Sequence, residues 1–355
     1  MKTFMKVSAL GCLFLILACG ASTAPYENSE WKNKGIASLE TIHLGNHPHS
    51  VLIRGTNKDN PLLIVIHGYA VPMMPFAHLD YADPSLEDGV TGEMEKHFII
   101  VNYDQRGAGK TARNKAPDET MNIDQLVRDA EELTEIMRKR FNKDRVYILG
   151  ISFGSIIGMK LAEKRPELFH AYISEGQAVN LPETYRDAID FITEQAALEN
   201  NMDALMDMTN TLPPSPENST EINITNTNLI LKWLEHYYSR TFSLQDLEPF
   251  FIKALWKAPE YTLPDMMVTL QSIETFTELT MQETMGIDMR KEVPGIDIPV
   301  YFIMGEYDVM KFAGRDYFNR LNAKEKHWLE IKKAGHAASA DQPEEVLNIY
   351  KEILK

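Results

Sequence analysis

Cysteine is almost absent from this chain of 355 residues, and its two copies, Cys12 and Cys19, lie close to the N-terminus. The body of the protein therefore lacks an internal disulfide, a thiol nucleophile and a metal site made of thiolates. Positive charge is also scarce, because 36 Lys and Arg stand against 51 Asp and Glu and give a formal net charge of −15. An acidic chain without a basic stripe binds nucleic acid poorly, so we expect no nucleic-acid partner.

The apolar run at residues 7–18 is shorter than a membrane span requires. It follows two lysines, and a basic start before a short apolar run is typical of a signal sequence, which we place at residues 1–20. Residues 15–19 (Leu-Ile-Leu-Ala-Cys) resemble a bacterial lipobox, which makes Cys19 a candidate for lipidation. Ordinary cleavage after Ala24 and an uncleaved anchor are the alternatives.

These patterns predict an exported protein. We expect a lipoprotein of a bacterial envelope, in contact with the membrane only through its lipid anchor, or otherwise a periplasmic or secreted protein. Residues 21–34 would form a polar tether. Removal of Lys2 and Lys6 with the signal sequence changes the formal charge from −15 to −17.

A Gly-x-Ser-x-Gly pattern occupies residues 150–154. The short apolar stretch 145–149 before it predicts a buried strand, and residues 155–164 after it predict a helix. A serine between a strand and a helix is typical of a nucleophile elbow, where the helix N-terminus favours an oxyanion. We therefore predict that Ser152 is a catalytic nucleophile.

A serine nucleophile of this kind needs a histidine and an acid later in the chain. Asp308 follows a predicted strand at residues 299–305, and we favour it as the acid over Glu306 and Asp316 because it lies in the loop just past the strand. His336 lies between a predicted last strand and a predicted last helix, and we predict that it is the catalytic base.

The oxyanion should receive two backbone N–H groups. We predict that Phe153 supplies one and Tyr69 the other, since Tyr69 lies in the loop after the predicted strand 62–66. His67 is expected to hold that loop in shape. The glycine-containing loop 104–110 lacks the spacing of a phosphate-binding loop, and we expect a structural turn in which Arg106 pairs locally.

Strands alternate with helices over residues 35–177 and 299–355, which predicts an α/β core with a mostly parallel sheet. One clear helix covers residues 123–141, where apolar residues recur with a period of 3.6 and Asn122 precedes them as an N-cap. Residues 178–298 show helical patterns and few strand signals. We expect them to form a helical cap inserted after the sixth strand, over the catalytic face.

The chain resembles the proline iminopeptidase-type serine hydrolases of the α/β-hydrolase superfamily. The resemblance is carried by residues 104–109, 150–155, 166–169, 305–308 and 335–336. A bacterial subgroup with a Tyr-Ile-Gly-x-Gly-Gln motif in its sixth strand is closer still, matching residues 172–177, 233–235 and 259–263. The resemblance implies an α/β-hydrolase fold that opens with an antiparallel strand pair, and a Ser-His-Asp triad.

One motif departs from the family. The oxyanion loop of iminopeptidases usually reads His-Gly-Gly-Pro-Gly, whereas residues 67–71 here read His-Gly-Tyr-Ala-Val, which argues against strict proline specificity. An aminopeptidase also needs carboxylates to hold a free amine, and we name Glu175 and Glu235 as candidates. A salt bridge or a solvated surface would explain either glutamate equally well.

Three hypotheses follow. The first is an aminopeptidase acting on short peptides, the second a carboxylesterase or other small-molecule acyl hydrolase, and the third a non-catalytic binding protein with the same fold. A serine at position 152, where an aspartate would be needed, argues against an epoxide hydrolase or a haloalkane dehalogenase. No metal-binding cluster is visible, and serine chemistry needs no cofactor, so we expect none.

Overall fold

The computed structural model describes residues 23, 29–69, 71–76, 89–218, 220–238 and 244–354. The predicted signal sequence, Cys19 and most of the tether lie outside the described residues, so export and lipidation stay predictions. Within the described part of the chain, no helix is long and apolar enough to cross a membrane.

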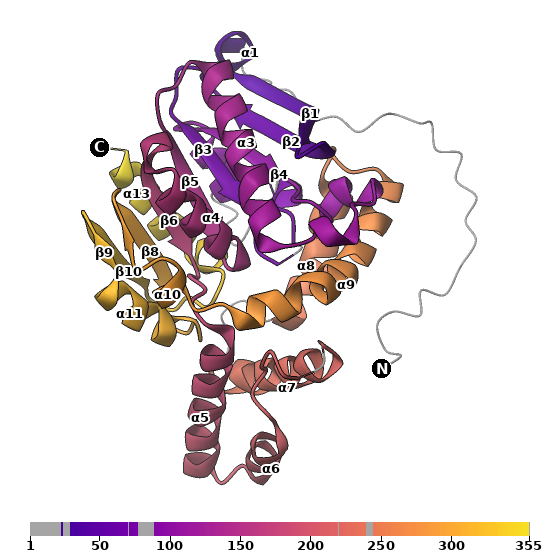
Figure 1. The fold of residues 1–355 in the computed structure, drawn as a ribbon, viewed down its shortest axis with the longest axis vertical. Helices are drawn as coiled ribbons and strands as arrows, with labels where there is room; N and C mark the ends of the chain where they lie inside the picture. Colours follow the sequence, from indigo (N-terminus) through magenta and orange to yellow (C-terminus); the bar gives the residue numbers. More distant parts are fainter. Residues whose placement is uncertain are drawn as a thin grey trace.

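A central sheet of eight strands runs through the molecule in the order β1-β2-β4-β3-β5-β6-β8-β10 (Figure 1). β2 pairs antiparallel with β1 and with β4, and the other neighbours pair parallel, which confirms the predicted mostly parallel sheet. The strands are β1 (Ile36–Leu44), β2 (His47–Gly55), β3 (Leu62–Ile66), β4 (Ile99–Tyr103), β5 (Val146–Ile151), β6 (Phe169–Glu175), β8 (Val300–Gly305) and β10 (Lys326–Ile331).

Helices cover both faces of this sheet because its inner strands are apolar on both sides. In β3, Ile64 and Ile66 pack on the face of α3, α4 and α11, whereas Leu63 and Val65 pack on the face of α2, α12 and α13. The helices are α2 (Gly89–Met94), α3 (Ile123–Phe141), α4 (Phe153–Lys164), α11 (Lys311–Arg320), α12 (Ala338–Asp341) and α13 (Pro343–Ile353).

Helix α3 begins and ends where the sequence predicts. The Asn122 side chain accepts a hydrogen bond from the amide of Gln125 and so caps the helix.

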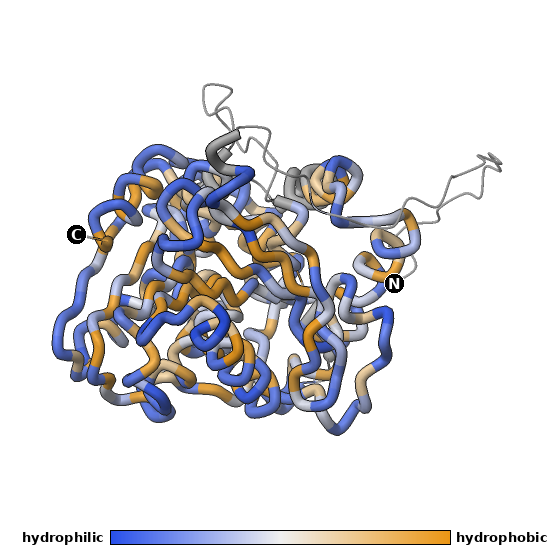
Figure 2. The backbone as a smooth tube through the Cα atoms, turned by 90° about the horizontal axis from the view of Figure 1, so that it is seen from above, coloured by the Kyte–Doolittle hydropathy of each residue, from blue (hydrophilic) through white to orange (hydrophobic). Residues whose placement is uncertain are grey.

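The remaining short elements of the core are α1 (Ser29–Lys34), η1 (Met74–Phe76), η2 (Gly109–Arg113), η3 (Asp118–Thr120), η4 (Pro166–Leu168), β7 (Gly295–Ile296) and β9 (Asn322–Ala323). Figure 2 shows the apolar segments gathered along the interior strands, with polar segments outside.

The segment between β6 and β7 is helical in the structure. It contains α5 (Leu181–Glu199), α6 (Met202–Asn210), α7 (Thr220–Tyr238), α8 (Leu244–Lys257), α9 (Leu263–Gly286) and α10 (Met289–Glu292). Helices α5, α6 and α7 project away from the sheet (Figure 1) and share an apolar cluster of their own. Helices α8 and α9 instead pack against the core beside β2 and the loop after β4.

Candidate active site

The turn between β5 and α4 holds Ser152 in a rare backbone conformation, with φ 52° and ψ −121°. Such a conformation costs a non-glycine residue about 1–3 kcal/mol and persists only where the surroundings impose it. Gly154 is part of those surroundings, because a Cβ atom there would lie 2.2 Å from the carbonyl oxygen of Ile66. The local structure is therefore the strand, turn and helix that the sequence predicts around Ser152.

The two residues predicted to supply the oxyanion donors, Phe153 and Tyr69, lie close to Ser152 and to each other. Helix α4 begins at Phe153, and the amides of a first helical turn have no partner inside the helix. The loop after β3 is close by, since a Cβ atom on Gly68 would lie 3.3 Å from the Cβ of Ser152. The next residue, Tyr69, packs its ring edge-on against Phe153 with centroids 4.8 Å apart. The two N–H roles themselves stay predictions.

His67 holds this loop in place. Its Nδ1 donates to the carbonyl of Gly68 at 2.7 Å, and its Nε2 accepts from the amide of Gln105 at 3.0 Å. The Gln105 side chain donates in turn to the His67 carbonyl at 2.8 Å. Burial lowers the pKa of His67 to about 4, so the ring is neutral near pH 7. His67 thus ties the loop after β3 to the loop after β4.

Asp308 and His336 meet across the ends of β8 and β10. The Nδ1 of His336 lies 3.0 Å from Oδ2 of Asp308, whose other oxygen accepts from the amide of Met310 at 2.9 Å. Asp308 is 1% exposed. A buried carboxylate on Nδ1 fixes the tautomer of the ring and leaves Nε2 for proton transfer.

The two rival acids have other partners. Glu306 accepts from the amide of Lys333 at 2.9 Å, and Asp316 pairs with Arg290 and Arg320 at 3.1 and 2.9 Å. The structure therefore brings Asp308 to His336 and uses Glu306 and Asp316 elsewhere.

The charge of His336 is set by opposing effects. Desolvation lowers the pKa of His336, but the charge of Asp308, the hydrogen bond to it and the charge of Glu175 together raise that pKa above its usual value. The His336 side chain is nevertheless 44% exposed. A partly exposed imidazole held by a buried carboxylate can both accept and return a proton.

The end of β6 lies between Ser152 and His336. The amide of Ser152 donates to the carbonyl of Glu175 at 2.9 Å. Gly176 follows with φ +66°, and a Cβ atom there would lie 2.6 Å from Cε1 of His336 and 3.3 Å from Oδ2 of Asp308. Only glycine combines this conformation with this approach. The serine, the aspartate and the histidine thus gather at the carboxyl ends of β5, β8 and β10.

The two candidate amine ligands occupy different places. Glu175 is 3% exposed, and its Oε1 accepts from the amide of Ser339 at 2.7 Å. Glu235 is half-buried on α7, next to Trp233 and Leu234, which pack against α5 and α6. The amine-binding roles of both glutamates stay predictions.

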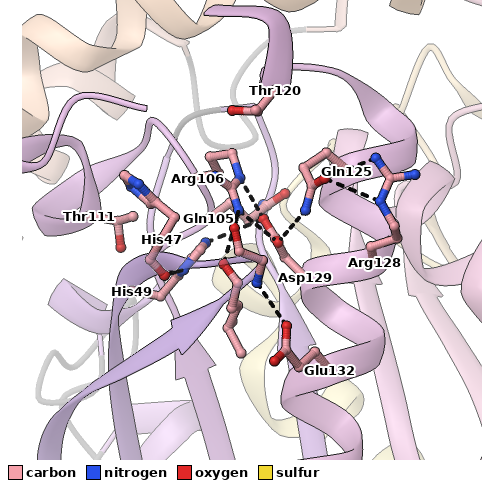
Figure 3. A network of polar contacts seen from close by, with 12 residues as sticks. His47, His49, Gln105, Arg106, Thr111, Thr120, Gln125, Arg128, Asp129 and Glu132 are labelled. Carbon is pink, nitrogen blue, oxygen red and sulfur yellow. Dashed lines mark hydrogen bonds and ion pairs between the residues drawn. The ribbon is translucent and has the colours of Figure 1, made fainter. Parts of the chain in front are cut away.

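The expectation that Arg106 pairs locally is wrong. Arg106 is buried and makes a two-pronged contact with Asp129 of α3 at 2.8 and 2.9 Å, and it also donates to the carbonyl of Leu44 at 3.0 Å (Figure 3). His49 and Gln125 complete the network around the same aspartate. The contact is long-range and not local, but its role is structural, because it joins the loop after β4 to α3 and to the β1–β2 hairpin.

A second polar cluster joins the loop after β4 to the cap, and the sequence did not reveal it. Lys110 donates to Asp265 of α9 at 2.8 Å, and the Tyr261 hydroxyl donates to Asp104 at 3.0 Å. Burial raises the pKa of Asp104 to about 7. The partners are about 155 positions apart, so no local pattern marks them.

No group of three His, Cys, Asp or Glu side chains that could hold a metal ion occurs within the described residues.

A mostly parallel sheet covered on both faces, with a serine on the elbow after its fifth strand, is the architecture of the α/β-hydrolases. The protein belongs to this class. The family model described as serine aminopeptidase, S33, matches residues 92–343, which is more than half of the chain. The chain is therefore a member of this hydrolase family.

Individual relatives agree with this assignment. A probable aminopeptidase, YbaC, of Bacillus subtilis (strain 168) is 24% identical over 318 residues, covering 88% of this chain and 94% of that protein. A proline iminopeptidase of Heyndrickxia coagulans is 24% identical over 261 residues, covering 74% of this chain and 83% of the relative. These matches confirm the predicted likeness to proline iminopeptidase-type α/β-hydrolases.

A solved structure shows the same fold. The proline iminopeptidase-related protein of Thermus thermophilus superposes with a TM-score of 0.57 at 18% identity, covering 90% of this chain and 97% of that one. At this identity the likeness supports the fold and not a substrate.

Proposed function

We propose that the protein is a serine hydrolase with the triad Ser152, His336 and Asp308, and that it acts as an aminopeptidase of proline iminopeptidase type on short peptides. One observation carries the proposal: the end of β6 contacts both the strained elbow of Ser152 and the His336–Asp308 pair, whose atoms lie 3.0 Å apart. Membership of the S33 family supports the choice of a peptide substrate.

In the proposed mechanism, Ser152 Oγ attacks the substrate carbonyl while His336 Nε2 takes its proton. Asp308 holds the ring and stabilises the imidazolium that forms. The N–H groups of Phe153 and Tyr69 receive the oxyanion. His336 then protonates the departing amine, which leaves an acyl-enzyme on Ser152. A water molecule hydrolyses this ester by the same steps, with His336 again as the base.

A substrate panel tests the class of substrate. It compares an aminoacyl p-nitroanilide with a free amine, its N-acetylated counterpart and a p-nitrophenyl ester. An aminopeptidase cleaves the free-amine anilide much faster than the acetylated one, because it binds the ammonium group. Equal rates on the two anilides, with a fast ester, would contradict the aminopeptidase proposal and favour the acyl-hydrolase alternative. Proline and other residues at the first position then define the side-chain preference.

We also propose that the protein is exported and anchored through Cys19. The lipobox-like residues 15–19 after a basic, apolar segment support this location. Wild-type protein should incorporate labelled palmitate and enter the detergent phase, and Cys19→Ser should block both. Unlabelled, soluble wild-type protein from a bacterial host with lipoprotein processing would contradict the anchor.

A further inference from the structure

Glu175 is a buried carboxylate beside the triad, and the proposed mechanism gives it no part. We propose that Glu175 is a positioning residue for His336: it ties the chain just after His336 to the end of β6 and places a second negative charge behind the His336–Asp308 pair, and it does not hold a substrate amine. This inference rests on the proposed function, because it concerns the base of that same triad.

The face of β6 on which Glu175 lies argues against contact with substrate. Side chains alternate along a strand, so Glu175 shares its face with Ile173. Ile173 packs in the apolar cluster of α12 and α13, while Tyr172 on the opposite face packs with α4. The Glu175 carboxylate is thus enclosed by the helices at the C-terminus of the chain, on the side away from α4.

The hydrogen bond made by Glu175 fixes the segment that carries the base. Its Oε1 accepts from the amide of Ser339, three positions after His336, at 2.7 Å. On the other side of the histidine, the amide of Gly335 donates to Asp341 at 2.7 Å. His336 is therefore held between two carboxylate–amide contacts. Asp341 of the nearby α12 supplies one of them, and Glu175 at the end of β6 supplies the other.

The charges around Glu175 favour an electrostatic role as well. The titratable groups that face it are His336, Asp308 and, from α13, Tyr350. Burial raises the pKa of Glu175, while the hydrogen bond from Ser339 and the charge of His336 lower it, and the net shift is upward. When ionised, Glu175 raises the pKa of His336 and so stabilises the imidazolium that forms in the transition state.

Two substitutions separate the charge from the anchor. Glu175→Gln removes the charge but keeps an oxygen that can accept from Ser339, whereas Glu175→Ala removes both. Glu306→Gln is the matched control, since Glu306 lies at the end of the neighbouring strand and accepts from the Lys332 side chain and from the amide of Lys333. Thermal unfolding of each variant reports whether it folds.

Glu175→Gln should lower kcat by roughly 3- to 10-fold with KM unchanged, equally on the free-amine anilide, the acetylated anilide and the ester. The acidic limb of its kcat/KM profile should move to lower pH, because His336 loses a stabilising charge. Glu175→Ala should lower kcat further, by roughly 10- to 100-fold, because a displaced base loses its alignment. Glu306→Gln should leave rates and the pH profile as in the wild type.

NMR titration of His336 measures the same change in pKa without any substrate. The inference can therefore be tested even if the protein shows no aminopeptidase or other hydrolase activity. The expected result is a lower His336 pKa in Glu175→Gln than in the wild type. An unmoved His336 titration and wild-type kcat in Glu175→Gln would overturn the inference and leave Glu175 with packing alone. A loss confined to the free-amine substrate and expressed in KM would also overturn it, in favour of amine binding.

Discussion

The end of the sheet around Ser152 and the outer cap helices α5, α6 and α7 are positioned by different forces. Around Ser152, backbone atoms approach so closely that only glycine fits at position 154. In the outer cap, α5, α6 and α7 pack around a small apolar cluster and leave large apolar side chains in solvent, including Leu198 at 72% exposure and Met206 at 61%.

This difference shows where the structure tolerates change. A site fixed by backbone contacts and buried hydrogen bonds has one working geometry, so its sequence pattern is readable. A cap held by apolar side chains can change its residues and keep its shape, because packing of about the right volume suffices. We therefore expect the core to define the reaction and the cap to define which substrates reach it.

The largest expected effect comes from the nucleophile. Ser152→Ala should lower kcat by roughly 10⁴-fold or more while the fold is kept, because the other groups of the site cannot replace the attacking oxygen. Steady-state rates of the purified variant measure the loss of kcat, and circular dichroism shows whether the fold is kept. Activity near that of the wild type would remove Ser152 from the mechanism.

Glycine substitutions compare the crowded turn at Ser152 with the end of α9, which has open space around it. Gly154→Ala should destabilise the protein by about 2–4 kcal/mol and abolish activity, because its Cβ would meet the Ile66 carbonyl at 2.2 Å. Gly286→Ala at the end of α9 should change stability by at most about 1 kcal/mol, in the stabilising direction, since nothing lies within 4 Å of its Cβ position. Urea denaturation gives both free energies of unfolding. Similar losses in the two variants would contradict the claim that close backbone contacts fix the turn at Ser152.

The contact between core and cap should make stability depend on pH. The pKa of Asp104 is raised to about 7 in the folded state. The stability that protonated Asp104 gives the folded protein is therefore fully present below the unfolded pKa of the group, and it is lost as pH rises through about 7. Relative to wild type, Asp104→Asn should therefore gain about 2–3 kcal/mol of stability between pH 5 and pH 8. A stability difference that is constant over this range would contradict the shifted pKa.

The smallest effect is expected on the outer cap. Met206→Gln should change the free energy of unfolding by no more than about 0.5 kcal/mol, because the side chain is 61% exposed on α6. Equilibrium unfolding in urea measures the change. A loss above about 1 kcal/mol would mean that the Met206 side chain makes contacts on which the stability of the protein depends, as the close contacts around Ser152 do.

Local patterns predicted the elements that local rules govern. Helix α3 with its Asn122 cap follows from apolar spacing and a capping residue, and the turn at Ser152 follows from its two glycines. The burial of Glu175 could have been suspected from the alternation that places it with Ile173 in β6.

Other contacts depend on which distant segments of the chain meet in the fold, and short sequence patterns do not indicate these pairings. The partner of Arg106 is Asp129, the partner of Glu175 is the amide of Ser339, and Lys110 pairs with Asp265 in the cap. Each contact is fixed by the tertiary arrangement of the chain. The same limit applies to the substrate, because the cap residues that would select it belong to no motif.

Fluorophosphonate labelling tests the central claim, that Ser152 is a nucleophile activated by His336 and Asp308. Mass spectrometry of the wild-type protein after labelling should find one adduct, on the peptide that contains Ser152. Ser152→Ala should remain unlabelled, and His336→Ala should react far more slowly. An adduct on another serine, or an unreactive wild-type protein that is folded, would contradict the account.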